Sequence, residues 1–361
     1  MPDVISFARG APAPEALDGD LIARCAASAL ADDPTVILSY GTGGGYPKLR
    51  EWLAAHHGTT ADRVLITNGS LEGYVFLLET FLQPGDLIAL EAPTYDRALL
   101  QAQMHGMEIL SVPMQADGMD VDALAAACDA GRVPKVVYTI PNFHNPAGTT
   151  MSAEKRTALI ALAERHGFWI LEDDPYGRLR FEGAAIPGLY ETGGSDRVMF
   201  SSSFSKTLAP GLRVGYLVAP AELVSTLTTR ANQTYISPAH LPEAAVLKVC
   251  ADGLLEPNIA RVTELMRVRR DAMAAGLGHM PEGTRCTPPE GGFFMWMELP
   301  DGMSADALLP VAQEAGVIYV AGSACFTEGH HNTLRLAYSG VSPEEITVGM
   351  ERLGQVFRSA L

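Results

Sequence analysis

Residues 135–177 read KVVYTIPNFHNPAGTTMSAEKRTALIALAERHGFWILEDDPYG, and their pattern determines the fold class. The first seven residues are rich in β-branched and apolar side chains and end at a proline, which is typical of a buried strand. A helix is predicted next, because Ser152 can cap its N-terminus, three apolar residues share one face, and Gly167 can stop it. FWILEDDP then predicts a second strand. Strand, helix and strand in this order predict a βαβ unit with parallel strands, whose ligands bind beyond the carboxyl ends of the strands.

The same alternation covers most of the chain before about residue 220. After about residue 240 it gives way to longer helices and then to GGFFMWMELP and NTLRLAYSG, which favours a smaller α+β domain. We predict an α/β fold with a mostly parallel sheet flanked by helices in a large domain (residues 39–240). A small C-terminal domain (241–361) and an N-terminal arm (1–38) that packs with it complete the prediction. The further strands expected in the large domain are VLITNG (64–69), LIALEAP (87–93), EILSVP (108–113), RVMFSSS (197–203) and RVGYLVAP (213–220).

Charge and composition narrow the functional class. The 361 residues carry a formal net charge of −16, which argues against nucleic acid or an anionic membrane as a partner but allows a local phosphate site. The five cysteines are scattered without a C-x-x-C pair, which gives no support for a metal site and predicts reduced thiols in a cytoplasm. The N-terminal MPDVISFARG lacks the features of a signal peptide, and no apolar run reaches membrane-spanning length. We therefore expect a soluble, cytoplasmic protein.

Residues 201–217, SSSFSKTLAPGLRVGYL, place Lys206 at the end of a serine-rich strand. Three interpretations compete: a solvated surface lysine, the S-x-x-K of a serine acyl-transferase, or an imine-forming lysine beside a phosphate held by the serines and Arg213. The second is disfavoured, because Ser203 follows a strand instead of opening a helix, no S-D-N follows, and K-T-L stands where K-T-G is expected. The residues at the other strand ends help to decide between the surface lysine and the imine-forming lysine.

Two earlier strand ends carry residues that suit a phosphorylated aromatic ring. Gly69 and Ser70 follow VLITN and open an amphipathic helix. Ser70 either caps this helix or, together with free backbone N–H groups and the helix dipole, holds a phosphate. Tyr95 follows the next strand in EAPTYDRAL, where it either packs as a half-buried residue or lies flat against an aromatic ring.

Two later strand ends add polar groups of a different kind. Asn145 lies in the turn PNFHNPAGT, either as ordinary turn chemistry or as a donor held rigidly at the cleft. Asp173 and Tyr176 stand three residues apart in LEDDPYG. The aspartate either caps a turn or pairs with a protonated pyridine nitrogen, in which case Tyr176 can donate to a phenolic oxygen.

Taken in order, the motifs G-S, P-T-Y, N-P-A-G, D-D-P-Y, S-F-S-K-x6-R and L-R-L resemble those of the fold type I pyridoxal-phosphate (PLP) aminotransferases. The subgroup with the most similar pattern includes the 2-aminoadipate and kynurenine aminotransferases and the catalytic halves of the MocR-type regulators. The resemblance extends from ISFARGAP to LRLAYSGVSPEEI, which is nearly the whole chain. It implies the PLP-dependent transferase fold of type I and pyridoxal 5′-phosphate as the cofactor.

The resemblance also implies roles for individual residues. Lys206 forms the imine with PLP and acts as general base and then as general acid. Asp173 binds the pyridine N–H, and Tyr95 stacks on the ring face. Tyr176 and Asn145 donate hydrogen bonds to the phenolic oxygen. The residues that hold the phosphate are Gly69, Ser70, Leu71 through its backbone N–H, Ser203, Ser205 and Arg213.

Three further residues, together with Asn145, complete the implied site. Arg335, in TLRLAYS, clamps the substrate α-carboxylate with its planar fork, and Asn145 and Gly10 also lie at the substrate. Tyr40, in SYGTGGGYPKLREW, matches a tyrosine that reaches the phosphate of the neighbouring subunit. The resemblance therefore implies a homodimer.

Three residues depart from the family pattern or have no clear place in it. Leu71 stands where glutamine is usual, so only its backbone can contact the phosphate. Arg9 stands in FARGAP where small residues are commoner, and it either reads an acidic substrate side chain or is a surface arginine. We expect His144, beside Asn145, to have a structural packing role.

The function implied by the resemblance is transfer of an amino group between an L-amino acid and a 2-oxo acid by ping-pong half-reactions, within amino-acid metabolism or biosynthesis. The motifs specify the cofactor and the carboxylate more closely than the reaction. A lyase, racemase, cyclase or oxidase of the same fold is therefore the alternative. A PLP-binding sensor is disfavoured, because the sequence begins at the catalytic core without the winged helix-turn-helix of the regulators.

Overall fold

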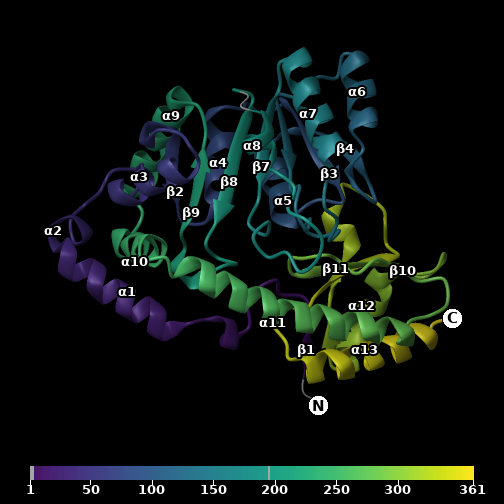
Figure 1. The fold of residues 1–361 in the computed structure, drawn as a ribbon. Coiled ribbons are helices and arrows are strands. Elements are labelled where there is room, and N and C mark those ends of the chain that lie inside the picture. The colour runs from purple at the N-terminus through teal and green to yellow at the C-terminus, as the bar shows by residue number, and fades with distance from the viewer. Residues whose placement is uncertain (1–3, 194–195) are drawn as a thin grey trace.

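A large sheet forms the centre of the computed structural model, which describes residues 4–193 and 196–361 (Figure 1). Within these residues the sheet has eight strands in the order β2-β9-β8-β7-β6-β3-β4-β5. All seven strands predicted for the large domain lie in it. The strands are β2 (Val64–Thr67), β3 (Leu87–Ala92), β4 (Glu108–Gln115), β5 (Gly118–Met119), β6 (Val136–Thr139), β7 (Trp169–Asp173), β8 (Val198–Ser203) and β9 (Gly215–Val218).

The direction of the strands explains where a ligand can bind. In the described chain, six of the eight strands run the same way, and β9 and β5 run against them. The prediction of a mostly parallel sheet is confirmed, but the sequence did not reveal the reversal of β9 between β2 and β8. Because β9 is antiparallel to β8, the connection that contains Lys206 and Arg213 stays at the edge where the parallel strands end.

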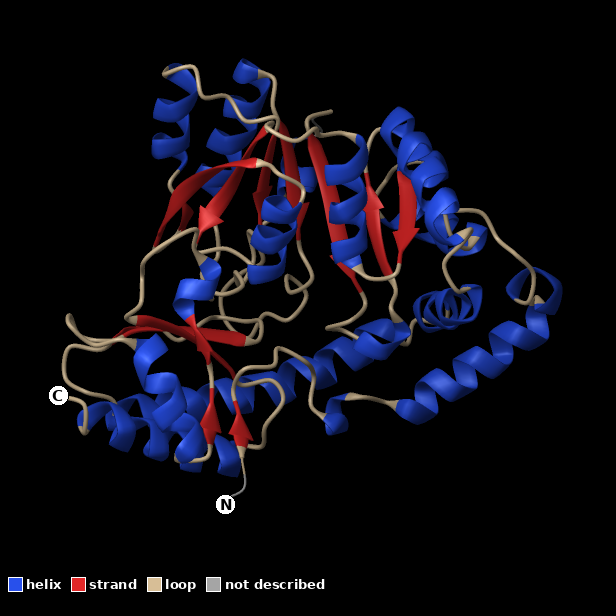
Figure 2. Cartoon of the chain, turned by 180° about the vertical axis from the view of Figure 1, so that it is seen from behind, coloured by secondary structure: helices blue, strands red, loops and turns tan. Residues whose placement is uncertain are grey.

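Helices lie on both faces of this sheet in the two opposite views (Figures 1 and 2). The helix predicted after residue 152 is confirmed as α7 (Ala153–His166). The Ser152 side chain accepts a hydrogen bond from the Lys155 N–H, and Gly167 ends the helix in the left-handed conformation with φ 81°. The other helices of this part are α3 (Pro47–His56), α4 (Ser70–Thr80), α5 (Asp96–Met104), α6 (Val121–Asp129), α8 (Leu189–Gly193), α9 (Ala221–Tyr235) and α10 (His240–Ala251).

A smaller antiparallel sheet lies beside the large one, with the order β10-β11-β14-β13. The beginning of the described chain joins this part, because β1 (Ile5–Ser6) pairs in parallel with β12 (Val317–Ile318). The small-domain elements are β10 (Arg285–Cys286), β11 (Phe294–Glu298), α12 (Ala305–Glu314), β13 (Val320–Ala321), β14 (Thr333–Ala337) and α13 (Pro343–Arg358). Two more helices near the beginning of the chain are α1 (Gly19–Asp32) and α2 (Pro34–Ile37).

The long helix α11 (Leu255–Ala275) passes below both sheets in Figure 1 and connects the two parts. The apolar core is also continuous between them, since one buried cluster contains Leu171 and Phe204 as well as Phe293 and Leu336. The site described next therefore lies in a single packed body. Among residues 4–193 and 196–361, no helix has the length and apolar character that crossing a bilayer requires.

Candidate active site

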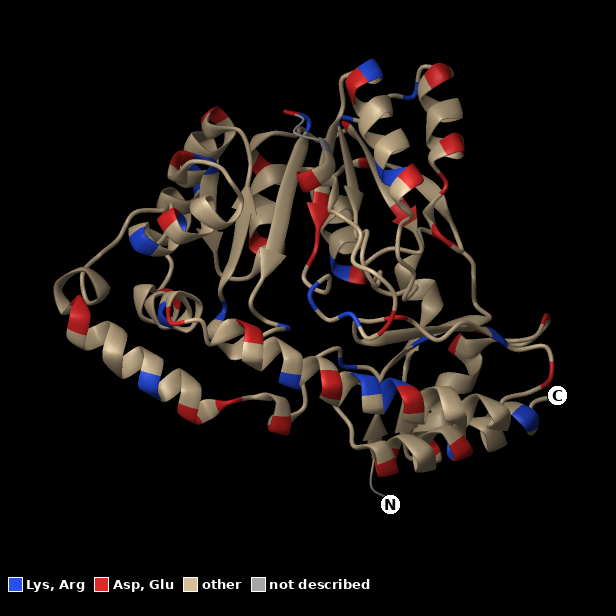
Figure 3. Cartoon of the chain, viewed as in Figure 1, with Lys and Arg blue, Asp and Glu red and all other residues tan. Residues whose placement is uncertain are grey.

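A cavity of about 180 Å³ lies at the carboxyl ends of the parallel strands. In Figure 3 several basic segments lie in this central region, between the sheet and α11, although the chain is acidic as a whole. Its wall contains every predicted cofactor residue except Tyr40: Gly69, Ser70, Leu71, Tyr95, Asn145, Asp173, Tyr176, Ser203, Ser205, Lys206 and Arg213. Ile140, Pro175 and Pro210 complete this wall.

Lys206 follows β8 and presents its amine at the cavity. Nζ donates a hydrogen bond to the Gly10 carbonyl at 2.7 Å, and it lies 5.8 Å from the Tyr176 ring centre and 5.6 Å from that of Phe293. Burial of the amine, together with the nearby arginines, lowers the pKa of Lys206 to about 8, while Asp173 opposes this shift. A substantial fraction of this amine is therefore neutral near physiological pH, as a nucleophile or proton acceptor requires.

Asp173, the last residue of β7, lines the cavity, and its two carboxylate oxygens differ in their partners. Its Oδ2 accepts a hydrogen bond from the Tyr138 hydroxyl at 2.7 Å. Its buried Oδ1 has no partner among the described residues. Burial raises the pKa of Asp173 to about 7, the Tyr138 hydroxyl opposes this rise, and Asp174 adds to it. A buried carboxylate oxygen that lacks a donor fits a protonated ring nitrogen of a ligand.

The residues on either side of Asp173 face a second cavity, of about 240 Å³, because side chains alternate along a strand. Glu172 accepts hydrogen bonds from the backbone N–H groups of Leu189 and Tyr190 at 3.0 and 2.8 Å. Asp174 accepts from the Gly177 N–H at 2.7 Å and from the Asn142 side chain at 2.9 Å. In contrast to Asp173, these two carboxylates have a protein donor on every oxygen.

The start of α4 forms one end of the first cavity. Gly69 is the N-cap with φ 90°, Ser70 is the first helical residue, and no side chain of the described chain caps this end. The interpretation of Ser70 as the N-cap is therefore wrong. A Cβ at position 69 would come within 2.2 Å of Arg213 Nη2, so only glycine lets the guanidinium approach this close. Unpaired backbone N–H groups beside a guanidinium and the Ser203–Ser205 hydroxyls fit a phosphate.

Arg335 lies on β14 of the small domain, outside the cavity wall, and contacts Asn145 of that wall. Its Nη1 donates to Asn145 Oδ1 at 2.9 Å and its Nη2 to the Ala8 carbonyl at 2.8 Å. The buried Nε has no partner in the described chain. The guanidinium also lies 4.5 Å from the Phe294 ring centre. A Cβ at Gly10 would come within 2.3 Å of the same ring, so this position requires glycine. The arrangement suits a bidentate contact with a carboxylate.

The two tyrosines predicted for the site have protonated hydroxyls. Burial raises the pKa of Tyr95 to about 12 and raises that of Tyr176 further. Tyr95 lies between β3 and α5, and Tyr176 is wedged against the rings of Phe293 and Phe294, with centre distances of 5.7 and 5.8 Å. At neutral pH both hydroxyls can therefore donate hydrogen bonds to a ligand oxygen.

Tyr40, Arg9 and His144 lie outside the cavity wall. Tyr40 is 88% exposed and borders a separate hollow between α2 and α10. Arg9 is also exposed. His144 is fully buried, with Nε2 2.9 Å from Glu91 Oε2 and with Nδ1 accepting a hydrogen bond from the Ala147 N–H. His144 thus supports the turn that presents Asn145, as expected of a packing residue.

The sequence reasoning missed Tyr138 and the aromatic pair Phe293–Phe294. Tyr138 lies within VVYTIP, a run that by itself predicts only a strand. A tyrosine in a fully buried strand needs a partner for its hydroxyl, and this requirement is the signal that could have found it. The two phenylalanines follow the glycines of EGGFF, which indicated a strand start but no contact with the site.

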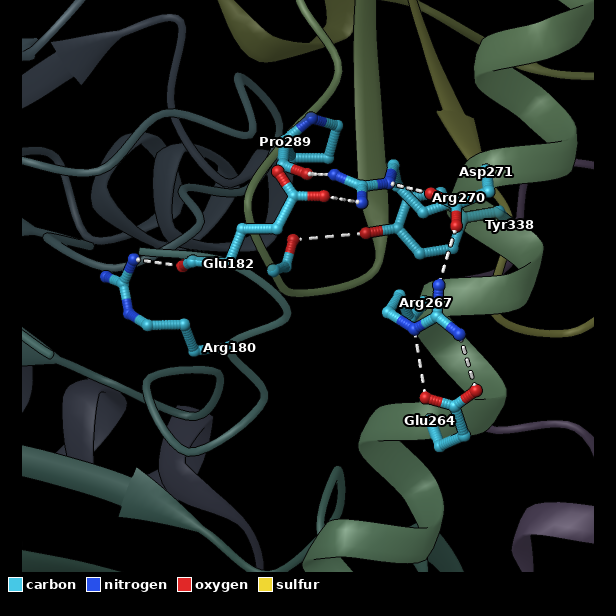
Figure 4. A network of polar contacts seen from close by, with 9 residues as sticks. Arg180, Glu182, Glu264, Arg267, Arg270, Asp271, Pro289 and Tyr338 are labelled. Carbon is cyan, nitrogen blue, oxygen red and sulfur yellow. Dashed lines mark hydrogen bonds and ion pairs between the residues drawn. The ribbon is translucent and has the colours of Figure 1, made fainter. Parts of the chain in front are cut away.

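A polar network joins the loop after β7 to the small domain (Figure 4). Arg270, buried on α11, donates to the Pro289 carbonyl at 2.6 Å and also contacts Glu182. The Tyr338 hydroxyl donates to the Gly291 carbonyl at 3.1 Å. These contacts fix the segment that leads into Phe293 and Phe294 against the loop that follows Tyr176, so this part of the small domain is held against the loop that carries Tyr176.

Comparison with known proteins shows what this geometry belongs to. The family model described as aminotransferase class I and II matches residues 2–353. The chain is similar to aromatic-amino-acid aminotransferase 1 of Thermococcus litoralis (34% identity, 99% of this chain and 89% of that one). It is also similar to 2-aminoadipate transaminase of Thermus thermophilus (36% identity, 100% and 91%). A structure of the Thermus thermophilus α-aminoadipate aminotransferase LysN, complexed with N-(5′-phosphopyridoxyl)-L-leucine, matches with a TM-score of 0.94 (35% identity, 99% and 92%). The chain belongs to the class I and II aminotransferases.

Proposed function

We propose that the cavity around Lys206 is the site at which this aminotransferase moves an amino group between an L-amino acid and a 2-oxo acid. One observation carries the proposal: a single cavity holds a lysine amine, a carboxylate oxygen with no partner in the described chain, and an uncapped helix N-terminus beside Arg213. These three groups fit the reactive carbon, the ring nitrogen and the phosphate of pyridoxal phosphate. When bound, this cofactor withdraws electrons from the substrate α-carbon and makes its proton acidic.

Lys206 is the point of covalent attachment and the carrier of the proton. A pKa of about 8 leaves part of the amine neutral, so that Nζ can bond to a carbonyl carbon. Once a substrate amine has taken its place, Nζ accepts the proton from the substrate α-carbon and later returns it. The Gly10 carbonyl, 2.7 Å from Nζ, accepts a hydrogen bond from the amine and so limits its movement.

The remaining cofactor residues orient the ring and tune its charge. Asp173 Oδ1 accepts the hydrogen bond of the ring nitrogen and so keeps it protonated. Tyr176 and Asn145 bind the phenolic oxygen, and Tyr95 stacks on the ring. The phosphate is held by Gly69, Ser70, the Leu71 N–H, Ser203, Ser205 and Arg213, all of which line the cavity.

Arg335 binds the α-carboxylate that all substrates share, and Asn145 and Gly10 lie beside it. The free Nε and the fixed orientation of the guanidinium support this role. An enzyme that binds an amino acid and an oxo acid in turn needs an anchor that does not depend on the side chain. Arg335 supplies that anchor.

We further propose that a second copy of the chain completes the site through Tyr40. Tyr40 lies in an exposed apolar surface with Leu38, Ile236 and Leu241, which are 72, 48 and 38% exposed. Apolar area of this kind is typical of an interface. We retain the division into an arm (1–38), a large domain (39–240) and a small domain (241–361), and a cytoplasmic location for its reduced cysteines.

The experiment that tests the proposal uses purified enzyme with PLP and single amino acids, with and without 2-oxoglutarate or pyruvate. Transamination predicts one conversion of the cofactor per site without an acceptor and continuous turnover with one. Repeated turnover without an acceptor, with release of ammonia or a racemised, cyclised or oxidised product, would mean that the enzyme catalyses a different reaction.

A further inference from the structure

Tyr138 contacts the carboxylate that faces the cofactor cavity but does not line the cavity itself. It lies in β6 and is 2% exposed. Its hydroxyl donates a hydrogen bond of 2.7 Å to Asp173 Oδ2. The other oxygen, Oδ1, is buried and has no partner among the described residues. One carboxylate oxygen is therefore fixed from within the sheet, and the other is left for a ligand.

The two neighbouring strands and the ring of Tyr74 hold Tyr138 in place. In the sheet, Tyr138 is paired with Leu171 of β7 and Leu90 of β3, so the backbone that carries it cannot shift without breaking two strand pairings. Its ring lies 5.1 Å from the ring of Tyr74, at 50°. This ring contact does not involve the Tyr74 hydroxyl, which donates to the Ala98 carbonyl at 3.2 Å. The Tyr138 hydroxyl therefore has a fixed position from which it donates its hydrogen bond to Asp173.

We propose that Tyr138 is a positioning residue for the reaction: its hydroxyl fixes Asp173 Oδ2 so that Oδ1 points at the ring nitrogen of the cofactor. This inference rests on the proposed role of Asp173. It assigns a task to a residue that touches neither cofactor nor substrate.

The electrostatics of the pair support the same role. Burial raises the pKa of Tyr138 well above its ordinary value, so the phenol keeps its proton and acts as the donor. A hydrogen bond donated to a carboxylate favours the ionised form, which Lys206 and Ser201 also favour. Without the hydroxyl, burial and the charge of Asp174 would act against an ionised Asp173 with less compensation. The hydroxyl therefore keeps the carboxylate both oriented and charged.

The test compares Tyr138→Phe with Tyr74→Phe. Both changes remove one hydroxyl from a buried, neighbouring tyrosine and keep the ring, so they are a matched pair. For Tyr138→Phe we expect the dissociation constant of PLP, measured on apoenzyme, to rise on the order of tenfold, because a hydrogen bond to a charged group is lost. The absorption maximum of the bound cofactor should shift, and kcat should fall on the order of tenfold with KM nearly unchanged.

For Tyr74→Phe we expect ordinary cofactor affinity, spectrum and kcat. A purely structural role for Tyr138 predicts that the two variants lose thermal stability alike and share the same cofactor affinity and spectrum, and this result would overturn the proposal. Should Tyr138→Phe fail to fold, a difluorinated tyrosine at position 138 keeps the shape and makes the hydroxyl more acidic. This replacement should shift the absorption spectrum of the bound cofactor, whereas the same replacement at position 74 should not. If the two fluorinated proteins have the same cofactor spectrum, the proposal is rejected.

A double-mutant cycle separates this inference from the function on which it rests. If Tyr138 acts through Asp173, Tyr138→Phe should change cofactor affinity and kcat little in an Asp173→Asn background. Full, additive effects in that background would overturn the positioning role and leave the role of Asp173 intact. If Asp173→Asn itself binds PLP and turns over like the wild type, the proposed role of Asp173 fails first.

Discussion

Two polar cavities lie on opposite sides of the strand end Glu172–Asp173–Asp174, and they differ in how their carboxylates are bound. The cavity lined by Glu172 and Asp174 is the larger, at about 240 Å³ against about 180 Å³. All four carboxylate oxygens of Glu172 and Asp174 accept a hydrogen bond from the protein. In the smaller cavity, Asp173 Oδ1 has no partner in the described chain, and the same holds for the nearby Arg335 Nε.

The difference teaches that free hydrogen-bonding capacity, more than volume, distinguishes the candidate active site from a structural cavity. A buried polar group without a partner costs about 1–3 kcal/mol. A ligand that completes such a group is one explanation for its presence. The satisfied carboxylates of the other cavity instead hold the loop that runs from Gly177 to Tyr190.

The largest effect in this comparison is expected from Lys206→Ala. It removes the amine that accepts and returns the proton, so turnover should fall by roughly a thousandfold or more. PLP should still bind through the phosphate contacts, which equilibrium dialysis can measure. Lys155→Ala, which removes a lysine paired with Asp117 outside the cavity, is the control and should keep the wild-type rate.

Borohydride treatment of the wild-type enzyme with bound PLP, followed by peptide mapping, should label Lys206. A label on another lysine contradicts the assignment.

Asp173→Asn and Asp174→Asn set the two cavities directly against each other. Asp173→Asn should lower kcat by about a hundredfold, because a preorganised electrostatic partner is lost. Asp174→Asn should leave the rate within a few-fold but lower the free energy of unfolding by about 1–3 kcal/mol, since a buried hydrogen-bonded carboxylate is replaced. Steady-state kinetics and urea unfolding give the two quantities. A larger rate loss in Asp174→Asn would mean that the assignment is wrong by one residue.

Arg335→Lys tests the second unpaired group, which lies beside the smaller cavity and contacts Asn145 of its wall. Lysine keeps the charge but loses the fork, so KM should rise about tenfold for the amino acid and the oxo acid alike. Initial rates with each substrate varied in turn provide the measurement. A rise for one substrate alone would show that Arg335 reads a side chain instead of the shared carboxylate.

The smallest expected effect is the pH dependence of the rate at which apoenzyme binds PLP. The pKa of Lys206 lies at about 8 in the folded protein, so its amine is protonated below this pH and neutral above it. The rate at which apoenzyme takes up PLP should therefore rise several-fold with pH and level off above about 8.5. Burial also raises the pKa of Glu172, in the other cavity, to about 7. Glu172→Gln should leave the midpoint unchanged, and a midpoint that moves with this variant would contradict the assignment to Lys206.

Local patterns were enough to predict seven of the eight described strands of the large sheet, all but β5, and the helices α4 and α7. Ser152 and Gly167 delimit α7 because capping and stopping are properties of a few neighbouring residues. The reversal of β9 was not predictable, because the direction of a strand depends on which strands pair with it. The apolar, β-rich pattern of RVGYLVAP fits a parallel and an antiparallel strand equally well.

The site was predictable to the extent that strand ends converge at one edge. Lys206, Asp173 and Arg213 meet there because parallel strands place their carboxyl ends side by side. Tyr138 was missed because its contact with Asp173 depends on the register of β6 and β7, which no local motif encodes. Tyr40 stays a prediction, since its proposed partner is a second chain.

The hydrogen bond from Arg335 to the Ala8 carbonyl has a consequence for the order in which the enzyme is made. It joins residues 327 positions apart, whereas every strand of the large sheet lies within residues 64–218. On the ribosome, the parts that hold the cofactor are complete long before Arg335 exists, and domains generally fold as they emerge. The strands that position the proposed cofactor residues can therefore form before β14, which carries the proposed carboxylate anchor, has been made. A chain that stops before β14 would lack that anchor.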